Sequence, residues 1–448
     1  MEPRLPRGMR DILPDQMMLR RYVIRVFEEV FEAYGFEPLQ TPALELRETL
    51  MGKYGPDAEK LIYDARHREG KEELSLRYDL SVPLARVVAM YPNLPRPFKR
   101  YQIAPVWRAE RPQKGRYREF YQCDADIVGV ASVAADAEII ALIDEALTRL
   151  GFRDFVILIN DRKLLTGLGR YSGVPEPLLG SLYRAIDKFD RLGLEGVREE
   201  MHRYGIPEEV IERMLELLRV EGDGAMVLEE LARRMQAAEI PEGLEGVEEL
   251  RALLRFVEAM GVAPERYRIS FTMVRGLEYY TGPIFETVVT EPKIGSITGG
   301  GRYDGLVGLF AKQSVPMTGT SFGIERIIDV IQELGMAPPD LPRTPTQVLV
   351  TVFDEPRMGA SIALARAFRK AGLATMLYFE PRRLEVQLRY AHQKGIPFVA
   401  IVGPDEEAQG MVTVRAMDSG EQRTLPPEEA VRWIRSALRG ELRREQAT

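Results

Sequence analysis

An arginine-rich loop is the part of this 448-residue chain best equipped for chemistry. Residues 95–118 contain eight lysines and arginines and a single acidic residue, Glu110. Arginine presents a flat set of donors that suits phosphate oxygens. The loop therefore predicts a site for a polyanion, and the alternative is an exposed basic hairpin with a solvated face.

Polar side chains continue directly after this loop in a strand-like run. Side chains alternate between the two faces of a strand, so Gln122, Asp124 and Asp126 are expected to share one face. This face predicts a small cationic or polar ligand beside the polyanion. For Asp124 and Asp126 the alternatives are a solvated strand edge or a pair of ligands for a divalent metal.

Further motifs lie upstream and downstream of this stretch in a fixed order. They are Leu76-Arg-Tyr-Asp-Leu-Ser-Val-Pro83, Arg275-Gly-Leu-Glu-Tyr-Tyr-Thr-Gly282, Gly299-Gly-Gly-Arg-Tyr-Asp-Gly305 and Gly323-Ile-Glu-Arg326. With the basic loop, they resemble histidyl-tRNA synthetase, a class II aminoacyl-tRNA synthetase. The resemblance covers nearly the whole chain, from Pro6-Arg-Gly-Met-Arg-Asp11 to the C-terminal region.

The resemblance implies a reaction in two steps. Histidine and ATP form histidyl-adenylate and pyrophosphate, and the histidyl group then moves to the terminal ribose of its tRNA. Such chemistry needs positioning and cationic stabilisation more than a protein nucleophile. The family's catalytic arginines match Arg108, Arg275 and Arg326, and its ATP contacts match Arg108, Glu110, Arg116 and Arg326.

The same resemblance implies a polar pocket for histidine. Its residues match Asp79, Ser81, Gln122, Asp126, Arg275, Tyr279, Tyr280 and Tyr303. Asp79 and Gln122 are expected nearest the ammonium, and Asp126, Tyr280 and Tyr303 beside the imidazole. A buried carboxylate that accepts an imidazole N–H discriminates against apolar side chains, which would leave it unpaired.

Two further features follow from the resemblance. The acceptor end of the tRNA is expected to contact Arg111, Gln113 and Lys114. Glu278 stands where the family usually has Asp. Asp79 and Asp126 stand where some bacterial members carry Glu, and this pairing is similar to the subgroup shared with archaeal and eukaryotic enzymes.

Composition restricts the kinds of protein that remain. Hydrophobic residues make up 45% and charged residues 29%, which is ordinary for a soluble globular protein. No run approaches the roughly 18 apolar residues that span a bilayer, and the N-terminus lacks the apolar segment of a secretory signal. We expect a cytoplasmic protein without a membrane partner.

Few side chains are available to bind a resident metal. The single cysteine, Cys123, excludes a cysteine-based zinc site, and three scattered histidines disfavour a histidine-based one. We expect no metal held by the protein alone, and Mg²⁺ carried by ATP and held mostly through phosphates.

Charge is distributed unevenly along the chain. The net charge of −7 argues against indiscriminate nucleic-acid binding. Residues 171–260 hold 11 basic and 20 acidic residues, whereas residues 344–448 hold 15 and 13. An RNA partner must therefore be bound by local patches.

Hydrophobic periodicity predicts two amphipathic helices near the N-terminal half. One covers 16–35 and is expected to end at Pro38 and Pro42, and the other covers 136–151. The segment Thr41-Pro-Ala-Leu-Glu45 resembles the first class II motif, which implies a homodimer interface. Residues 171–260 lack strand patterning and predict a helical insertion.

The pattern changes after a proline-rich stretch that ends near residue 345. Apolar strands are predicted at 348–352 and 398–402, and helices at 358–371 and 384–394. Strands that alternate with helices indicate a small α/β domain with a mostly parallel sheet. It resembles the family's anticodon-binding domain.

We therefore expect an α/β fold with two domains. An α+β catalytic domain on a class II antiparallel sheet is predicted over 1–335, with the insertion at about 171–260. A linker at 336–345 leads to a C-terminal α/β anticodon-binding domain over 346–440. The expected partners are histidine-specific tRNA, L-histidine, ATP and a second copy of the chain.

Two other functions are less consistent with the sequence. The regulatory paralogue of ATP phosphoribosyltransferase typically lacks the C-terminal domain and parts of the arginine set, and both are present here. A nucleotide-dependent dehydrogenase would need a G-x-G-x-x-G fingerprint at a βαβ unit, and none occurs.

Overall fold

The computed structural model describes residues 2–54, 56–113, 115–218, 224–274 and 279–439. These residues form two compact units. The first comprises Met1–Asp11 and Tyr22–Met336, and the second comprises Ile12–Arg21 and Ala337–Thr448. Over the described ranges, no helix combines the length and the apolar character that a membrane crossing requires.

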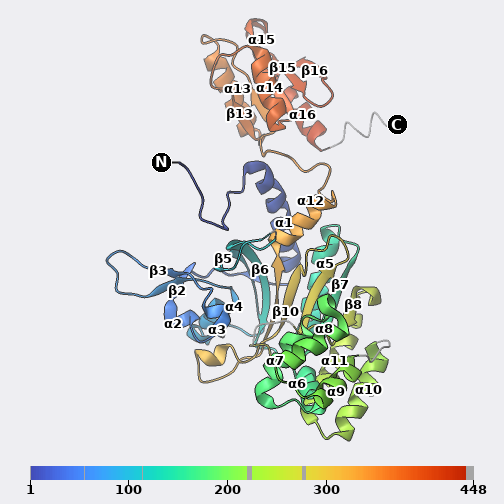
Figure 1. Ribbon diagram of the computed structural model, residues 1–448. Helices are drawn as coiled ribbons and strands as arrows, with labels where there is room; N and C mark the ends of the chain where they lie inside the picture. The colour runs from blue at the N-terminus through green and yellow to red at the C-terminus, as the bar shows by residue number, and fades with distance from the viewer. Residues whose placement is uncertain (1, 55, 114, 219–223, 275–278, 440–448) are drawn as a thin grey trace. The chain divides into compact units, whose positions relative to one another are not determined.

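A mixed sheet of eight strands forms the centre of the first unit (Figure 1). Its strands are β1 (Glu37–Pro38), β5 (Phe98–Trp107), β6 (Glu119–Val128), β7 (Phe155–Asp161), β8 (Tyr267–Ile269), β9 (Pro283–Val289), β10 (Thr298–Arg302) and β11 (Met317–Gly323). They follow the order β1-β5-β6-β11-β10-β9-β7-β8. The predicted antiparallel sheet is confirmed for the inner pairs, and only the edge pairs β1–β5 and β7–β8 are parallel.

Two predicted amphipathic helices cover one face of this sheet. They are α5 (Ala134–Arg149) and the part of α1 (Pro14–Ala33) that belongs to this unit, residues 22–33. Phe322 of β11 packs against Phe27 of α1, with ring centroids 4.7 Å apart. The helix α1 ends before Pro38, since Gly35 takes a left-handed conformation with φ of 78° and turns the chain.

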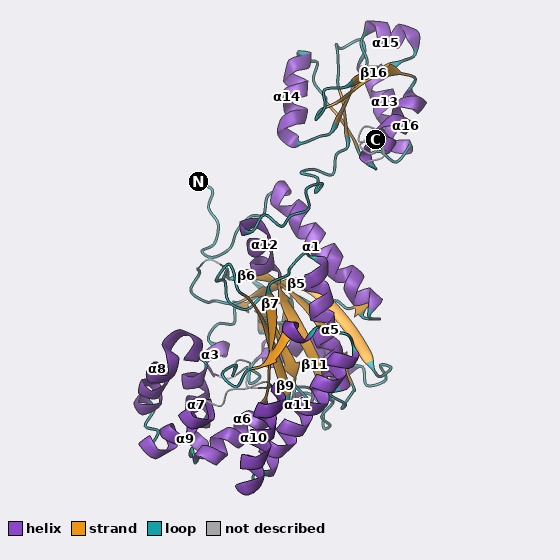
Figure 2. Ribbon diagram, turned by 90° about the vertical axis from the view of Figure 1, so that its right-hand side faces the viewer, coloured by secondary structure: helices purple, strands orange, loops and turns teal. Residues whose placement is uncertain are grey.

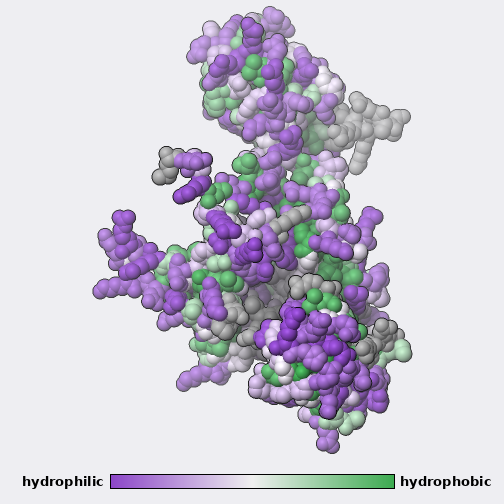
Figure 3. Space-filling model, in the orientation of Figure 1, coloured by the Kyte–Doolittle hydropathy of each residue, from purple (hydrophilic) through white to green (hydrophobic). Residues whose placement is uncertain are grey.

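A group of helices is inserted after β7. They are α6 (Arg162–Ser172), α7 (Leu179–Ile186), α8 (Phe189–Arg203), α9 (Glu208–Leu218), α10 (Gly224–Ala237) and α11 (Pro241–Ala259). The helical character predicted for 171–260 is confirmed, and the first helix already begins at Arg162. Figures 1 and 2 show these helices gathered beside one end of the large sheet, and Figure 3 shows that their outer surface is mainly hydrophilic.

The rest of the first unit consists of shorter elements. They are β2 (Leu44–Leu46), β3 (Asp64–Ala65), β4 (Leu74–Leu76), α2 (Arg47–Leu50), α3 (Pro56–Glu59), α4 (Ser81–Met90) and α12 (Ile324–Glu333). The three strands form a small sheet in the order β2-β4-β3. Leu44 and Leu46 of β2 are 44% and 41% exposed and project from the same face, so this sheet exposes two apolar side chains on its edge strand.

The second unit is a five-stranded sheet flanked by helices. Its elements are β12 (Val348–Val350), α13 (Met358–Lys370), β13 (Thr375–Leu377), α14 (Leu384–Lys394), β14 (Phe398–Ile401), α15 (Pro404–Gln409), β15 (Val412–Ala416), β16 (Gln422–Leu425) and α16 (Pro427–Leu438). The strand order is β13-β12-β14-β15-β16. Strand β12 is parallel to both of its neighbours, but β14–β15 and β15–β16 are antiparallel.

The expectation of a mostly parallel sheet was therefore wrong for two of the four strand pairs in this unit. The connection at 417–421 is short, and a short connection can join only antiparallel strands. The continuous apolar strands are explained by burial on both faces. Val348 and Val350 belong to one apolar cluster, whereas Leu349 between them belongs to another.

Helices α11 and α6 pack closely against each other, and this contact between their backbones can be tested by substitution. A methyl group added at Gly246 would lie 2.4 Å from the backbone nitrogen of Leu164 and 2.9 Å from its Cα. We expect Gly246→Ala to lower the free energy of unfolding by about 1–3 kcal/mol, because two helix backbones would have to separate. Thermal and urea unfolding measure this change.

The matched control is Gly359→Ala in α13, where an added methyl group meets no atom within 4 Å. Alanine is the better helix former, so the control is expected to be neutral or stabilising by up to about 1 kcal/mol. Equal melting temperatures for Gly246→Ala and the unaltered protein would contradict the tight contact.

Candidate active site

Two adjoining cavities lie on the face of the large sheet opposite α1. The first has a volume of about 200 Å³ and the second of about 270 Å³. Arg108, Gln122, Glu286, Gly299 and Ser321 line both, so the cavities share a wall. A ligand that occupied both would therefore pass directly by Arg108.

Strand β6 supplies the polar floor of the first cavity. Gln122, Asp124 and Asp126 all line it, as the alternation of a strand predicts. Cross-strand pairing places Arg100 of β5 opposite Asp126 and Ser321 of β11 opposite Asp124. The three side chains therefore lie in the middle of the sheet, where Asp124 and Asp126 are almost completely buried.

Asp126 is held by two buried partners. The guanidinium of Arg100 lies 2.8 Å from Asp126 Oδ2, and the Tyr303 hydroxyl donates to Asp126 Oδ1. Burial raises the pKa of the Asp126 carboxyl, and the positive charge of Arg100 opposes that rise. The absence of a side chain at Gly319 leaves room for the carboxylate, since an added Cβ would lie 2.0 Å from Oδ1.

Asp79 enters the cavity from the start of α4. Its Oδ1 accepts hydrogen bonds from the backbone N–H of Val82 at 3.1 Å and from the Tyr54 hydroxyl at 2.8 Å. Burial raises the pKa of Asp79, although these hydrogen bonds favour its ionised form. Ser81, two residues later, lines the same cavity.

Several buried acceptors in this cavity have no hydrogen-bond partner among the described residues. They are Asp79 Oδ2, Gln122 Oε1, Asp124 Oδ1 and Asp126 Oδ2, and the last of these is ion-paired with Arg100. Buried polar atoms are nearly always satisfied, so unsatisfied acceptors indicate a ligand rich in donors. An ammonium group supplies three donors in one atom, and an imidazole supplies ring N–H groups.

Three tyrosines form the aromatic wall of the first cavity. The ring centroids of Tyr279 and Tyr303 lie 5.6 Å apart, and those of Tyr280 and Tyr303 lie 6.3 Å apart. Burial raises the pKa of each of these phenols, so all three remain protonated donors. A flat, polar ring suits this wall.

The second cavity is lined by arginines. Arg108 donates from Nε to the carbonyl of Tyr78 at 3.1 Å, and its guanidinium lies over the rings of Tyr78 and Phe120 at 4.3 and 5.1 Å. Arg326, near the start of α12, donates to the carbonyl of Ser296 at 2.6 Å. These contacts fix two guanidinium groups along one cavity, which suits a ligand with several phosphates.

Glu110 and Arg116 also line the second cavity and form an ion pair with each other. Of the residues expected at the tRNA acceptor end, Arg111 and Gln113 lie in the same loop, are exposed and line neither cavity. The backbone N–H of Gln113 donates to the carbonyl of Arg116 at 3.1 Å and closes the loop. Lys114 and Arg275, both named from the sequence, lie outside the described residues.

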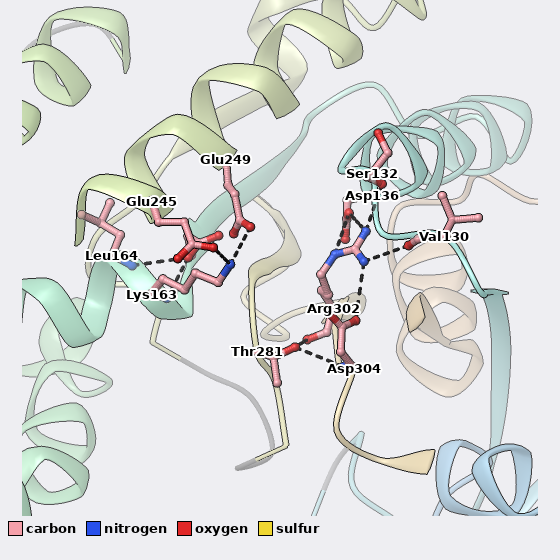
Figure 4. A network of polar contacts seen from close by, with 11 residues as sticks. Val130, Ser132, Asp136, Lys163, Leu164, Glu245, Glu249, Thr281, Arg302 and Asp304 are labelled. Atoms are coloured by element: carbon pink, nitrogen blue, oxygen red, sulfur yellow. Dashed lines mark hydrogen bonds and ion pairs between the residues drawn. The ribbon is translucent and has the colours of Figure 1, made fainter. Parts of the chain in front are cut away.

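A polar network behind the first cavity fastens the segments that carry its tyrosines. Figure 4 shows Arg302 between Asp136, Val130 and Ser132. The carbonyl of Arg302 accepts from the backbone N–H of Thr281 at 2.8 Å. Tyr280 and Tyr303 are the chain neighbours of Thr281 and Arg302. The contacts of Arg302 on the helix-covered face of the sheet therefore help to fix the positions of both tyrosines.

The same view shows the attachment of the insertion. Lys163 lies 2.6 Å from both Glu245 and Glu249 of α11 (Figure 4). Asp161 accepts from the backbone N–H of Lys163 at 2.7 Å. Burial and the nearby Glu249 raise the pKa of Asp161 well above its usual range. Helix α11 is therefore fixed beside the segment at Gly282 that leads into β9.

The structure brings to the site three residues that were not predicted from the sequence. Arg100, Glu286 and Ser321 lie on β5, β9 and β11. Arg100 falls within the basic stretch 95–118, which was expected to be a loop but contains strand β5, and no individual role was assigned to it. Glu286 and Ser321 belong to none of the motifs. The pairing of β5 with β6 could have identified Arg100, but only once the length of the intervening loop was known. Nothing in the sequence alone distinguishes Glu286 or Ser321 from a surface residue.

Comparison with known proteins places the chain among relatives of similar length. The family model described as "Histidyl-tRNA synthetase" matches residues 8–327, and the model described as "Anticodon binding domain" matches residues 347–437. A histidine–tRNA ligase of Aeropyrum pernix is 46% identical over 97% of this chain and 98% of its own length. A histidine–tRNA ligase of Porphyromonas gingivalis is 41% identical over 96% of this chain and 98% of its own length.

Solved structures give the same result. A crystal structure of histidyl-tRNA synthetase from Nostoc has a TM-score of 0.84 and 33% identity, and the match covers 98% of this chain and all of that one. A Bacillus halodurans structure described as an ATP phosphoribosyltransferase regulatory subunit/histidyl-tRNA synthetase has a TM-score of 0.71. Its 24% identity shows a shared fold alone, so the regulatory alternative receives less support.

The close approach of Gly319 to Asp126 provides a test of the first cavity. We expect Gly319→Ala to push the Asp126 carboxylate away from Arg100 and Tyr303 and to weaken binding of L-histidine by about 10-fold or more. Isothermal titration measures the affinity. Gly308→Ala, where the nearest atom is 4.0 Å from the added methyl group, is the control. Unchanged affinity in Gly319→Ala would show that the position of Asp126 does not matter.

Proposed function

The chain belongs to the histidyl-tRNA synthetase family, and we propose that its two adjoining cavities hold L-histidine and ATP. It is a histidine–tRNA ligase, which joins histidine to its tRNA with the use of ATP. The observation that carries the proposal is the shared wall at Arg108, with carboxylates and tyrosines on one side and arginines on the other.

The acid-rich cavity is assigned to histidine. Asp79 and Gln122 accept from the ammonium, and their unsatisfied oxygens support this role. Asp126, oriented by Arg100 and Tyr303, accepts an imidazole N–H. Ser81, Tyr279, Tyr280 and Tyr303 complete the wall. Arg275 is added to the histidine site on the sequence resemblance alone. An amino acid without a ring N–H would leave buried acceptors unpaired, which is a strong basis for selection.

The arginine-rich cavity is assigned to ATP. The carboxylate of histidine attacks the α-phosphorus, a new C–O–P linkage forms, and the bond to pyrophosphate breaks. Arg108 lies where the two anions meet and lowers their repulsion. Arg326 contacts the outer phosphates and Arg116 is a further phosphate contact, whereas Glu110 lies beside the adenine. Arg275 is a third catalytic arginine by the sequence resemblance.

The second step transfers the histidyl group to the 3′ end of tRNA. A ribose hydroxyl attacks the carbonyl carbon of the adenylate, and AMP leaves. Arg111, Gln113 and Lys114 are assigned to the acceptor end, because glutamine can read a base edge and lysine suits phosphate. The exposure of Arg111 and Gln113 supports this role.

Mg²⁺ is proposed to enter with ATP. The carboxylates of Glu110, Glu286 and Glu325 line the second cavity and fit the oxygen ligands that Mg²⁺ prefers. Among the described residues, no group of three or more His, Cys, Asp or Glu side chains is placed to hold a metal. The phosphates of ATP therefore supply most of the ligands in this proposal, and the ion offsets their charge.

A homodimer and a cytoplasmic location complete the proposal. The exposed leucines of β2 support an interface at the small sheet, next to the segment 41–45 that resembles the first class II motif. The absence of a membrane-spanning helix over the described ranges is consistent with the location.

The carboxyl ends of β12 and β13 are the proposed contact for the anticodon. Phe353 and Phe379 follow these neighbouring parallel strands and are 53% and 72% exposed. Exposed aromatic rings offer platforms on which unpaired bases stack. Arg382 and Arg383 follow Phe379 and are exposed, so phosphates can be contacted at the same edge.

Histidine-dependent exchange of pyrophosphate with ATP tests the first step without tRNA. We expect exchange with histidine and little with other amino acids. Arg108→Lys is expected to lower the exchange rate by about 100-fold, or about 3 kcal/mol, because one ammonium cannot replace the guanidinium fork. The control is Arg68→Lys at an exposed position. Absence of exchange in the unaltered protein would favour the regulatory paralogue.

Substitution of an exposed aromatic residue tests the second unit. Phe379→Ala is expected to weaken tRNA binding by about 1–3 kcal/mol and to leave pyrophosphate exchange unchanged. Aminoacylation kinetics at varied tRNA concentration measure the loss. Ile362→Ala removes an apolar side chain of α13 that is 50% exposed and serves as the control. Equal charging by Phe379→Ala and the unaltered protein would remove this edge from the tRNA contact.

A further inference from the structure

Asp124 is a buried carboxyl group that the proposed reaction does not use. It lies on β6 between Gln122 and Asp126, lines the first cavity and is 2% exposed. Its Oδ1 has no hydrogen-bond partner among the described residues. Asp126, by comparison, has a charged partner and a hydrogen-bond donor: Arg100 forms an ion pair at its Oδ2, which accepts no hydrogen bond among the described residues, and Tyr303 donates to its Oδ1. The cavity therefore contains a second carboxyl with an oxygen available to a ligand.

Charge in this cavity is unbalanced before any ligand enters. Among the described lining residues there are four carboxyl groups, on Asp79, Asp124, Asp126 and Glu286, and one guanidinium, on Arg108. Arg100 behind the cavity is committed to Asp126. The ammonium of histidine supplies one more positive charge, and its carboxylate brings a negative one. A further proton would reduce the remaining negative charge.

We propose that Asp124 reads the second nitrogen of the imidazole, so that the Asp124 carboxyl and that nitrogen share one proton. The assignment rests on the histidine site proposed above and adds a specificity-determining residue to it. The ring then makes a hydrogen bond at each nitrogen, one with Asp126 and one with Asp124.

The spacing of the two carboxyls fits this arrangement. Residues two apart on a strand are separated by roughly 7 Å on the same face. An imidazole with a hydrogen bond of roughly 2.8 Å at each nitrogen spans a comparable length. A ring that lies along β6 between Asp124 and Asp126 is thus in reach of both, with the tyrosine wall against its face.

The acidity of Asp124 is matched to that of the ligand. Burial raises the pKa of the Asp124 carboxyl to about 7, and the charge of Arg100 opposes that rise. An imidazole has an unperturbed pKa of roughly 6.5. The groups that act on Asp124 come from every neighbouring element: Arg100 of β5, Asp126 of β6, Asp79 before α4, Ser321 of β11, and Arg77, Tyr279 and Tyr280.

Proton linkage gives this assignment its own signature. At about pH 8 the free Asp124 carboxyl is ionised and the free imidazole is neutral. Formation of the complex must therefore take up protons from solvent, to a maximum of about one per histidine bound. At about pH 5.5 both groups are protonated when free, and binding releases a proton instead. The number of protons taken up therefore changes sign near neutral pH.

Isothermal titration of the full-length protein with L-histidine measures this number, in buffers of different ionisation enthalpy. Asp124→Asn is expected to abolish uptake at about pH 8. It should raise the Michaelis constant for histidine in pyrophosphate exchange by about 10- to 100-fold and leave that for ATP unchanged. Asp405→Asn, an exposed substitution in α15, should retain uptake and both constants.

Three results would overturn the assignment. Histidine binding to the unaltered protein without proton uptake at about pH 8 excludes a shared proton, whether or not the variant folds. Unchanged uptake in folded Asp124→Asn places the proton elsewhere. No histidine binding by the unaltered protein would overturn the proposed function as well, so that failure is distinguishable from a failure confined to Asp124.

Discussion

The ion pair between Arg100 and Asp126 is the interaction on which the first cavity depends. A carboxylate removed from water without a cation costs several kcal/mol, and the middle of a sheet offers no solvent to offset this. Arg100 supplies the cation from the adjacent strand at 2.8 Å and is itself fully buried. Tyr303 and the missing side chain at Gly319 then leave the carboxylate one orientation.

The cavity is also held from the opposite face of the sheet. Consecutive residues of a strand point to opposite faces, so Arg302 reaches the helix α5 while Tyr303 reaches Asp126. Packing of α5 on the sheet is thereby linked to the position of the tyrosine. The same segment pairs with Thr281, and so the wall of the cavity and the helical layer behind it form one rigid arrangement.

Much of this organisation could be predicted from the sequence, for identifiable reasons. Strong periodicity predicted α5, α13 and α14, and alternation predicted that Gln122, Asp124 and Asp126 share a face. Strand pairing was harder to predict. The antiparallel half of the second sheet depends on β15 and β16, whose short length and mixed composition carry little signal of their partners.

The remaining parts of the site depend on register between strands distant in sequence. Arg100 and Asp126 become neighbours only through the pairing of β5 and β6. Gly319 becomes a neighbour of Asp126 only through the pairing of β6 and β11. A single sequence does not specify such offsets, because a shift of one residue gives an equally regular pattern with every side chain on the other face. Arginine motifs, by contrast, are recognised from residue type and local spacing alone.

The wall that the two cavities share has a consequence for the intermediate of the reaction. In the proposed assignment histidine and ATP each fill one cavity, whereas an adenylate would occupy both through a single covalent link. Linking two ligands makes the second contact intramolecular and raises its effective concentration, so affinity can exceed that of either half by orders of magnitude. On this assignment, contacts in both cavities would retain the labile anhydride between the two steps, with Arg108 where the cavities meet. Unreactive analogues of the adenylate that keep both halves should bind with the same gain in affinity.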